Sequence, residues 1–123
     1  MSAAVNEERR NARRETDSVT PTGRIQLDAT SGRISGYLPN IDVTMESAAA
    51  FAGSQAIGVV LTGMGNDGAH AMARLHAEGG RTIAEAEETA VVWGMPGELV
   101  AANGADWVLP LPEIAGWLRK LAP

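Results

Sequence analysis

Apolar residues in this chain alternate between short continuous runs and stretches with helical spacing. The run at residues 57–61 holds only apolar residues and glycine, which is typical of a strand buried on both faces of a parallel sheet. Near the carboxyl terminus, Ile114, Trp117, Leu118 and Leu121 recur at the spacing of one helix face. Together with glycine and proline stop signals, these patterns predict strands at 24–28, 33–38, 57–61, 81–84 and 107–109 and helices at 43–52, 69–77, 97–102 and 112–121.

The order of these elements determines the fold class. From residue 57 onward strands alternate with helices, which implies parallel pairing through right-handed crossovers. The sequence therefore predicts an α/β fold, a parallel sheet in a three-layer, Rossmann-like half-domain. Asp42 is the expected cap of the helix at 43–52, and Gly53 is expected to end it.

Residues 1–22 differ in composition from the rest of the chain. They are mostly charged or small, with few apolar residues, and they end in a turn signal at residues 20–23. Such a segment cannot bury enough apolar area to order itself, so we expect a disordered tail at 1–22 and one domain at 23–123.

Composition limits the function classes. The chain has 123 residues, no cysteine and a formal charge of −5, so thiolate metal ligation is excluded and a nucleic-acid surface is disfavoured. No apolar stretch approaches the roughly 20 residues that a bilayer requires. We expect a soluble, cytoplasmic protein without membrane insertion, nucleic-acid binding or a resident metal.

The glycine-rich turn after the strand at 57–61 is the strongest candidate for chemistry. Asp67 stands at the carboxyl end of that strand and the amino end of the next helix, where open α/β sheets place ligands and reactive groups. The alternative is a plain helix cap in which Asp67, or Asn66, accepts from first-turn amides. His70 is one turn further on and could pair with Asp67, whereas His76 falls on another face, so the two histidines lack metal spacing.

The same turn also satisfies the dinucleotide-binding spacing, through Gly63, Gly65 and Gly68. Glu85 stands about where an acid that holds a ribose would be expected. Against this interpretation, the unit is not the first in the chain, Asp67 would repel a pyrophosphate, and Met64 is bulky in a turn that needs close backbone approach. Glu85, Glu87 and Glu88 are otherwise expected to form a solvated acidic run, and the three tryptophans to be core or interface aromatics.

Several spaced motifs resemble one known family. Residues 39–42 and 47–49 (Pro-Asn-Ile-Asp and Ser-Ala-Ala), 57–69 with the turn Leu-Thr-Gly-Met-Gly-Asn-Asp-Gly-Ala, 80–96 ending in Trp-Gly-Met-Pro, and 104–114 follow in order. Together they resemble the carboxyl-terminal part of CheB, the chemotaxis protein-glutamate methylesterases. Asn40 stands where that family usually has serine, Glu85-Ala86 where Gln-Asp is common, and Trp93 where tyrosine or phenylalanine is common.

The resemblance implies a function. Family enzymes hydrolyse glutamate methyl esters on chemoreceptors and release methanol, without a cofactor. Asp67 matches the aspartate of their Ser-His-Asp triad, whose task is to orient the histidine. Residues Thr62, Gly63, Met64 and Gly65 would line the same cleft, with Met64 providing a wall or a backbone amide near the oxyanion.

The family's serine and histidine come from upstream of everything that this chain matches. Ser47 and Ser54 lack a strand-to-helix nucleophile turn, and Ser18, Ser31 and Ser35 lie in the tail or in turns. We therefore expect the chain alone to be almost inactive. It would be a fragment, one half of a split enzyme completed by a second chain or by self-association, or a non-catalytic binding remnant. The other expected partner is the cytoplasmic region of a methylated chemoreceptor.

Overall fold

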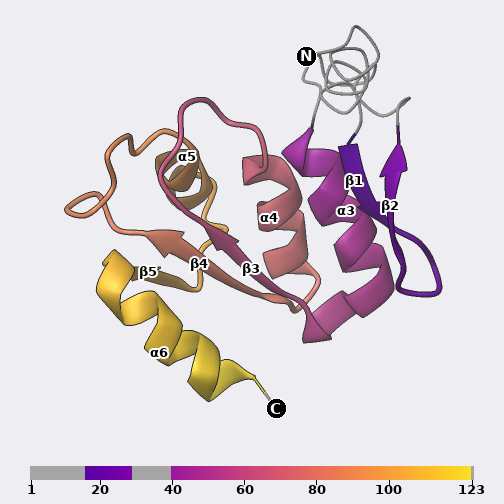
Figure 1. The fold of residues 1–123 in the computed structure, drawn as a ribbon. Helices are drawn as coiled ribbons and strands as arrows, with labels where there is room; N and C mark the ends of the chain where they lie inside the picture. The colour runs from indigo at the N-terminus through magenta and orange to yellow at the C-terminus, as the bar shows by residue number, and fades with distance from the viewer. Residues whose placement is uncertain (1–15, 29–39, 123) are drawn as a thin grey trace, which may run out of the picture.

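The computed structural model describes residues 16–28 and 40–122 of the chain (Figure 1). Their helices and strands follow in the order β1 (Thr16–Val19), β2 (Ile25–Asp28), α3 (Ile41–Ala52), a short 3₁₀ turn (Gly53–Gln55), β3 (Ile57–Val60), α4 (Ala69–Ala77), β4 (Arg81–Glu85), α5 (Met95–Ala101), β5 (Trp107–Leu109) and α6 (Leu111–Leu121).

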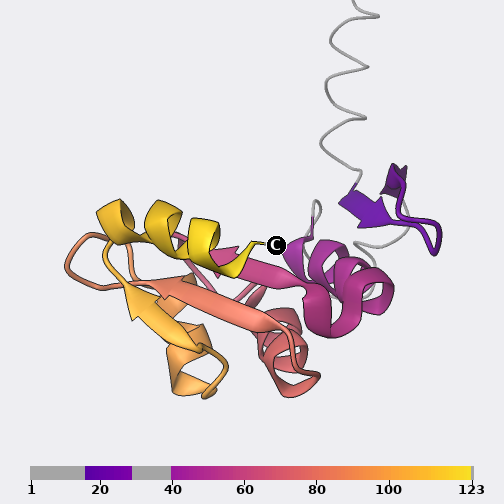
Figure 2. The ribbon, with the colours of Figure 1, turned by 90° about the horizontal axis from the view of Figure 1, so that it is seen from below.

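A parallel sheet with the strand order β3-β4-β5 forms the centre of the fold. β4 pairs with both neighbours, from Ile57 opposite Arg81 to Glu85 opposite Leu109. Helices α4 and α5 cover one face of this sheet and α6 lies on the other (Figure 2). The predicted three-layer α/β arrangement is therefore confirmed.

The core lies mainly between the sheet and helices α4 and α5. It is built from Ala49, Val60, Met72, Leu75, Ala84 and Leu99. β4 is the central strand, and four of its five residues are buried. Gly58 of β3 leaves room for the Met72 side chain, because a Cβ at residue 58 would overlap its sulfur. This close approach brings α4 onto β3 and sets the path of the loop that joins them.

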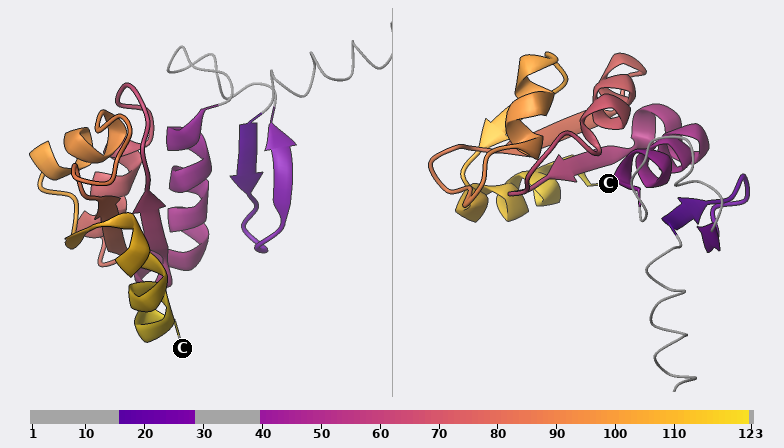
Figure 3. Two further views of the ribbon diagram at one scale, coloured as in Figure 1. Left: turned by 60° about the vertical axis from the view of Figure 1, so that its left-hand side comes forward. Right: turned by 90° about the horizontal axis from the view of Figure 1, so that it is seen from above.

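Strands β1 and β2 form a separate antiparallel ribbon beside α3 (Figure 3). β1 lies within the segment that we expected to be a disordered tail; residues 1–15 fall outside the described part of the chain. The residues of β1 that face α3 are polar: Thr16 and Ser18 are buried, and the Val19 amide donates to Ser47 Oγ at 2.8 Å. The Asn40 amide also donates to Thr16 Oγ1, and the Thr44 hydroxyl donates to Asp17 O. Because polar contacts join β1 to α3, the hydrophobic pattern could not reveal this strand.

Most predicted element boundaries agree with the structure. α4 and β5 have the predicted bounds. β3, β4 and α6 differ from prediction by one residue at one end, α3 begins two residues earlier, and α5 begins two residues earlier and ends one residue earlier. β2 confirms the strand predicted at 24–28, whereas the strand predicted at 33–38 lies outside the described residues. Within the described ranges, no helix is long and apolar enough to cross a membrane.

Candidate active site

The loop from β3 to α4 lies at the carboxyl edge of the parallel sheet, as the sequence predicted. Beside it are the end of β4 and the segment that leads from β4 into α5 (Figure 1). A backbone bridge between Gly63 and Trp93 joins the two loops. The predicted site residues are thus held between two neighbouring strand ends, which is where α/β folds build sites.

Asp67 lies in the loop just before α4, but its carboxylate is held by the first turn of α3. Its Oδ2 accepts from the Ile41 backbone amide at 2.9 Å, and its Oδ1 accepts from the Asp42 amide at 3.1 Å. Both amides belong to the first turn of α3, so the carboxylate neutralises two of the four donors that a helix start leaves unpaired. The expectation that Asp67 or Asn66 caps the following helix was wrong: α4 begins at Ala69, and its cap residue, Gly68, offers no side chain.

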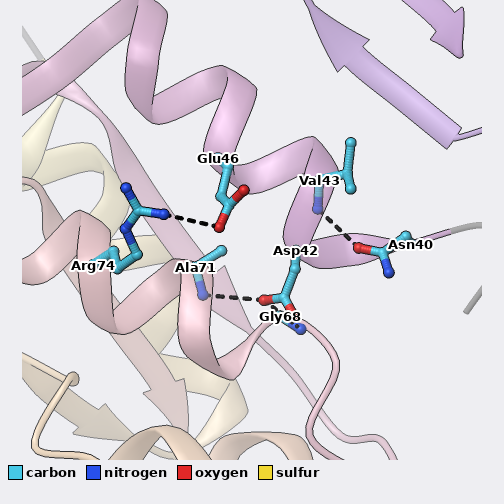
Figure 4. Close-up of polar contacts among 7 residues, drawn as sticks. All are labelled: Asn40, Asp42, Val43, Glu46, Gly68, Ala71 and Arg74. Atoms are coloured by element: carbon cyan, nitrogen blue, oxygen red, sulfur yellow. Dashed lines mark hydrogen bonds and ion pairs between the residues drawn. The ribbon is translucent and has the colours of Figure 1, made fainter. Parts of the chain in front are cut away.

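Asp42 makes the reciprocal contact. The cap of α3 is Asn40, whose Oδ1 accepts from the Val43 amide at 2.9 Å, so the prediction of Asp42 as cap was wrong. Asp42 Oδ1 instead accepts from the amides of Gly68 at 3.1 Å and Ala71 at 3.0 Å, at the start of α4 (Figure 4). Sequence reasoning missed this role because the donors are 26 and 29 residues away.

The beginning of the site loop is held just as firmly. Thr62 exchanges two hydrogen bonds with Val92, its hydroxyl donating to the carbonyl at 3.1 Å and accepting from the amide at 2.8 Å. The Gly63 amide donates to Val92 O at 2.9 Å, and Gly63 O accepts from Gly94 and Met95. Gly94 must be glycine here, since a Cβ would lie 2.7 Å from Gly63 O.

The amides of Met64 and Gly65 differ from those of Thr62 and Gly63 in their hydrogen bonding. The latter two donate to Glu85 and to Val92, so they have no capacity for a ligand. Among the hydrogen bonds of the described residues, none uses the amide of Met64 or Gly65. Met64 is 78% exposed, and Gly65 has the left-handed φ of 83°. The amides of Met64 and Gly65 are therefore not used by the contacts that hold the rest of the loop.

Glu85 corrects the sequence interpretation of the acidic run. Glu87 and Glu88 are exposed, as predicted, but Glu85 is 2% exposed at the end of β4. Its Oε1 accepts from the Thr62 amide at 2.8 Å and its Oε2 from the Thr89 hydroxyl at 2.9 Å. A buried carboxylate that is satisfied in this way supports the site loop and is not available to a ligand.

These contacts weigh against the dinucleotide interpretation. A pyrophosphate would need the amides at the start of α4, but those of Gly68 and Ala71 already donate to Asp42. The acid expected on the ribose, Glu85, is enclosed. The spacing of Gly63, Gly65 and Gly68 therefore reflects loop packing rather than nucleotide binding.

The two histidines have different surroundings, and neither contacts Asp67 among the described hydrogen bonds and ion pairs. His70 is exposed, and within the described residues no hydrogen bond or ion pair joins it to Asp67. His76 lies at the opposite end of the strands, where its Nδ1 is 3.2 Å from Asp106 Oδ1. In the part of the chain that the structure covers, no three His, Asp or Glu side chains gather in a way that could hold a metal ion.

Three comparisons identify similar proteins. The family model described as CheB methylesterase matches residues 4–118. A protein-glutamate methylesterase/protein-glutamine glutaminase of Rhodopseudomonas palustris is 54% identical over 96 residues, which cover 77% of this chain and 26% of the relative. The protein-glutamate methylesterase FrzG of Myxococcus xanthus is 46% identical over 102 residues, 83% of this chain and 30% of the relative.

A solved structure agrees with these sequence matches. The crystal structure of the Thermotoga maritima CheB methylesterase catalytic domain superposes with a TM-score of 0.79 at 34% identity, and the match covers 90% of this chain and 59% of that domain. The chain spans less than a third of the length of the two curated relatives described above.

Proposed function

Because the chain belongs to the CheB methylesterase family, we propose that its site loop is part of a hydrolase site that cleaves methyl esters of glutamate side chains on proteins. Asp67 is the orienting carboxylate of that site. The serine and histidine come from the portion of the relatives that these 123 residues do not span, or from a second chain. The fixed carboxylate of Asp67 at the carboxyl edge of the sheet is the observation that carries the proposal.

The geometry of Asp67 suits an orienting role. An ionised carboxylate has about four acceptor positions, and the Ile41 and Asp42 amides occupy two of them. The others remain for the Nδ1–H of an imidazole. Two backbone donors prevent rotation of the carboxylate, so it would hold the histidine in one tautomer and stabilise the imidazolium that forms during turnover.

The chemistry then follows the serine hydrolase scheme. The histidine takes the serine proton, the serine attacks the ester carbonyl, and the protonated histidine returns the proton to the departing methanol. Water cleaves the acyl-enzyme by the same route and leaves a glutamate carboxylate. In the tetrahedral intermediates, the negative oxygen is stabilised by the amides of Met64 and Gly65, the two residues whose donors are not used within the described loop.

The names of the relatives support a substrate class for this proposal. They are called protein-glutamate methylesterases, and several are also called protein-glutamine glutaminases. Both reactions pass through a glutamyl acyl-enzyme and differ only in the leaving group, methanol or ammonia. We propose methylated chemoreceptors as the protein substrate and chemotaxis adaptation as the setting, with the cytoplasm as the location.

The sheet supports the need for a further polypeptide segment. β3 is an outer strand in the described order β3-β4-β5, and Leu61, just beyond its end, is 42% exposed. An outer strand of a parallel sheet offers unpaired backbone groups to another segment. We expect the isolated chain to self-associate or to bind the segment that carries the serine and histidine; a monodisperse monomer by size exclusion with light scattering would argue against this.

Methanol release from a methylated chemoreceptor fragment tests the function. The chain is assayed alone and mixed with a half-domain that bears the family's serine and histidine. We expect activity only in the mixture, reduced by about 10⁴-fold when Asp67→Asn removes the correct acceptor, as for the aspartate of other triads. Asn66→Ala, which alters the exposed neighbouring side chain, is the matched control and should retain activity.

The outcome separates the two function classes. If the mixture releases no methanol although the two parts bind each other, the chain is better described as a non-catalytic binding module. Activity that survives in Asp67→Asn would contradict the role of Asp67 while leaving the family reaction in place.

A further inference from the structure

We infer that Asp42 is a positioning residue for Asp67. From its place in α3, Asp42 fixes the start of α4, and thereby the orientation of Asp67. This inference rests on the proposed role of Asp67. No feature of the sequence assigned Asp42 a task in the site, since it was expected only to cap its own helix. In the structure, the Asp42 amide donates to the Asp67 carboxylate, and the Asp42 carboxylate accepts from the amide of Gly68, the residue after Asp67.

The two carboxylates cap each other's helices. Asp67 accepts from the amides of Ile41 and Asp42 at the start of α3, at 2.9 and 3.1 Å. Asp42 accepts from the amides of Gly68 and Ala71 at the start of α4, at 3.1 and 3.0 Å. Four backbone amides that would otherwise lack an intrahelical partner are thus satisfied by two side chains that cross between the helices.

The exchange leaves little freedom to Asp67. α4 has no side-chain cap of its own, because its first flanking residue is Gly68 with a φ of 92°. Gly68 also packs against Ile41, since a Cβ there would lie 2.8 Å from Ile41 Cγ2. Without the Asp42 carboxylate, the peptide between Asp67 and Gly68 would lose its hydrogen-bond acceptor and could rotate. The Asp67 carboxylate would then no longer point consistently at a histidine.

The arrangement also explains how two acidic side chains are accommodated so close together in the fold. Each carboxylate lies at the amino end of a helix, where the peptide dipoles favour negative charge. α3 has 12 residues and α4 has 9, so both helices are long enough to contribute. Since the donors are backbone amides, the network does not depend on flexible basic side chains.

A second link between the same helices provides the control. Glu46, one turn after Asp42 on α3, pairs with Arg74 on α4 at 3.1 Å (Figure 4). This ion pair is exposed and has no contact with Asp67 among the described hydrogen bonds. Glu46→Gln therefore disturbs the contact between α3 and α4 without touching the carboxylate exchange.

The test that does not depend on activity is amide hydrogen exchange at Ile41, whose N–H donates to Asp67. In Asp42→Ala we expect exchange at Ile41 to accelerate by about tenfold or more, because a hydrogen bond to a charged acceptor is lost. Asp42→Asn keeps an acceptor oxygen at the same place and should restore protection, and Glu46→Gln should leave it unchanged. Unaltered protection at Ile41 in Asp42→Ala would overturn the inference.

The second readout is the kinetics of the completed enzyme, which is the mixture of this chain with the half-domain that bears the serine and histidine. We expect Asp42→Ala to lower kcat by up to about 100-fold with little change in KM, because a misdirected carboxylate affects the reaction rather than protein docking. A rise in KM as large as the fall in kcat, or an equal fall in kcat in Glu46→Gln, would indicate a merely structural role.

If Asp42→Ala does not fold, Asp42→Glu replaces it, since the added methylene displaces the acceptor. If no mixture is active, the proposed function fails, and exchange at Ile41 still decides the role of Asp42.

Discussion

Glu85 and Thr62 join the centre of the sheet to the site loop: the buried Glu85 carboxylate accepts from the Thr62 backbone amide at 2.8 Å. The other carboxylate oxygen accepts from Thr89, whose hydroxyl in turn accepts from the Leu111 amide at the start of α6. Glu85 O accepts from the Trp93 indole at 2.7 Å. One residue of β4 therefore connects three segments that surround the carboxyl edge of the sheet.

Glu85→Ala should destabilise the fold. The substitution removes the acceptor of the Thr62 amide and of the Thr89 hydroxyl, two part-buried hydrogen bonds, and a hydrogen bond to a charged group contributes about 1.5–3 kcal/mol. We expect a fall of about 2–5 kcal/mol in the free energy of unfolding, allowing for an added cavity. Urea denaturation followed by circular dichroism measures it.

Glu85→Gln distinguishes hydrogen bonding from charge in the same experiment. Glutamine keeps an oxygen for the Thr62 amide and offers an N–H to the Thr89 oxygen. We expect its stability to lie within about 1 kcal/mol of the unsubstituted chain. A glutamine variant as unstable as the alanine variant would show that the negative charge of Glu85, rather than its two acceptors, supports the loop.

Gly94→Ala should displace the site loop. A Cβ at residue 94 would lie 2.7 Å from Gly63 O, 3.0 Å from Gly65 N and 3.1 Å from Met64 Cα, all of them backbone atoms that cannot rotate away. We expect a stability loss of about 1–3 kcal/mol, the usual cost of overpacking. In the completed enzyme, methanol release should fall further than this loss explains, because the amides of Met64 and Gly65 move.

Gly116→Ala is the matched control for this glycine. Gly116 lies within α6, and a Cβ there would meet no atom within 4 Å. Alanine should stabilise the helix by about 0.5–1 kcal/mol and leave catalysis unchanged. Equal effects of the two substitutions on methanol release would contradict the idea that Gly94 acts through the loop.

The fold could largely be predicted from sequence because its signals are local. α4 and β5 have the predicted bounds, since apolar spacing and flanking glycines mark their ends within a few residues. Asp67 could likewise be singled out, because a strand, a glycine turn and a helix follow one another without interruption. Its role in a triad remains a prediction.

The remaining features depend on contacts between distant positions. The carboxylate exchange joins Asp42 and Asp67, and neither residue's own surroundings in the sequence indicate which helix it caps. Glu85 resembles its exposed neighbours Glu87 and Glu88, and only its place at the end of a central strand buries it. Polar residues at the inner face of β1 made that strand look like part of a tail.

Ser47→Ala should loosen β1 from α3 and leave the site intact. Ser47 Oγ accepts from the Val19 amide at 2.8 Å and donates to Thr44 O at 2.8 Å, so alanine removes both bonds. We expect a cost of about 0.5–1.5 kcal/mol and faster amide exchange at Val19, with protection at Ile41 unchanged. Ser54→Ala, at an exposed serine, should alter neither amide. Faster exchange at Ile41 in Ser47→Ala would instead mean that the ribbon helps to hold Asp67.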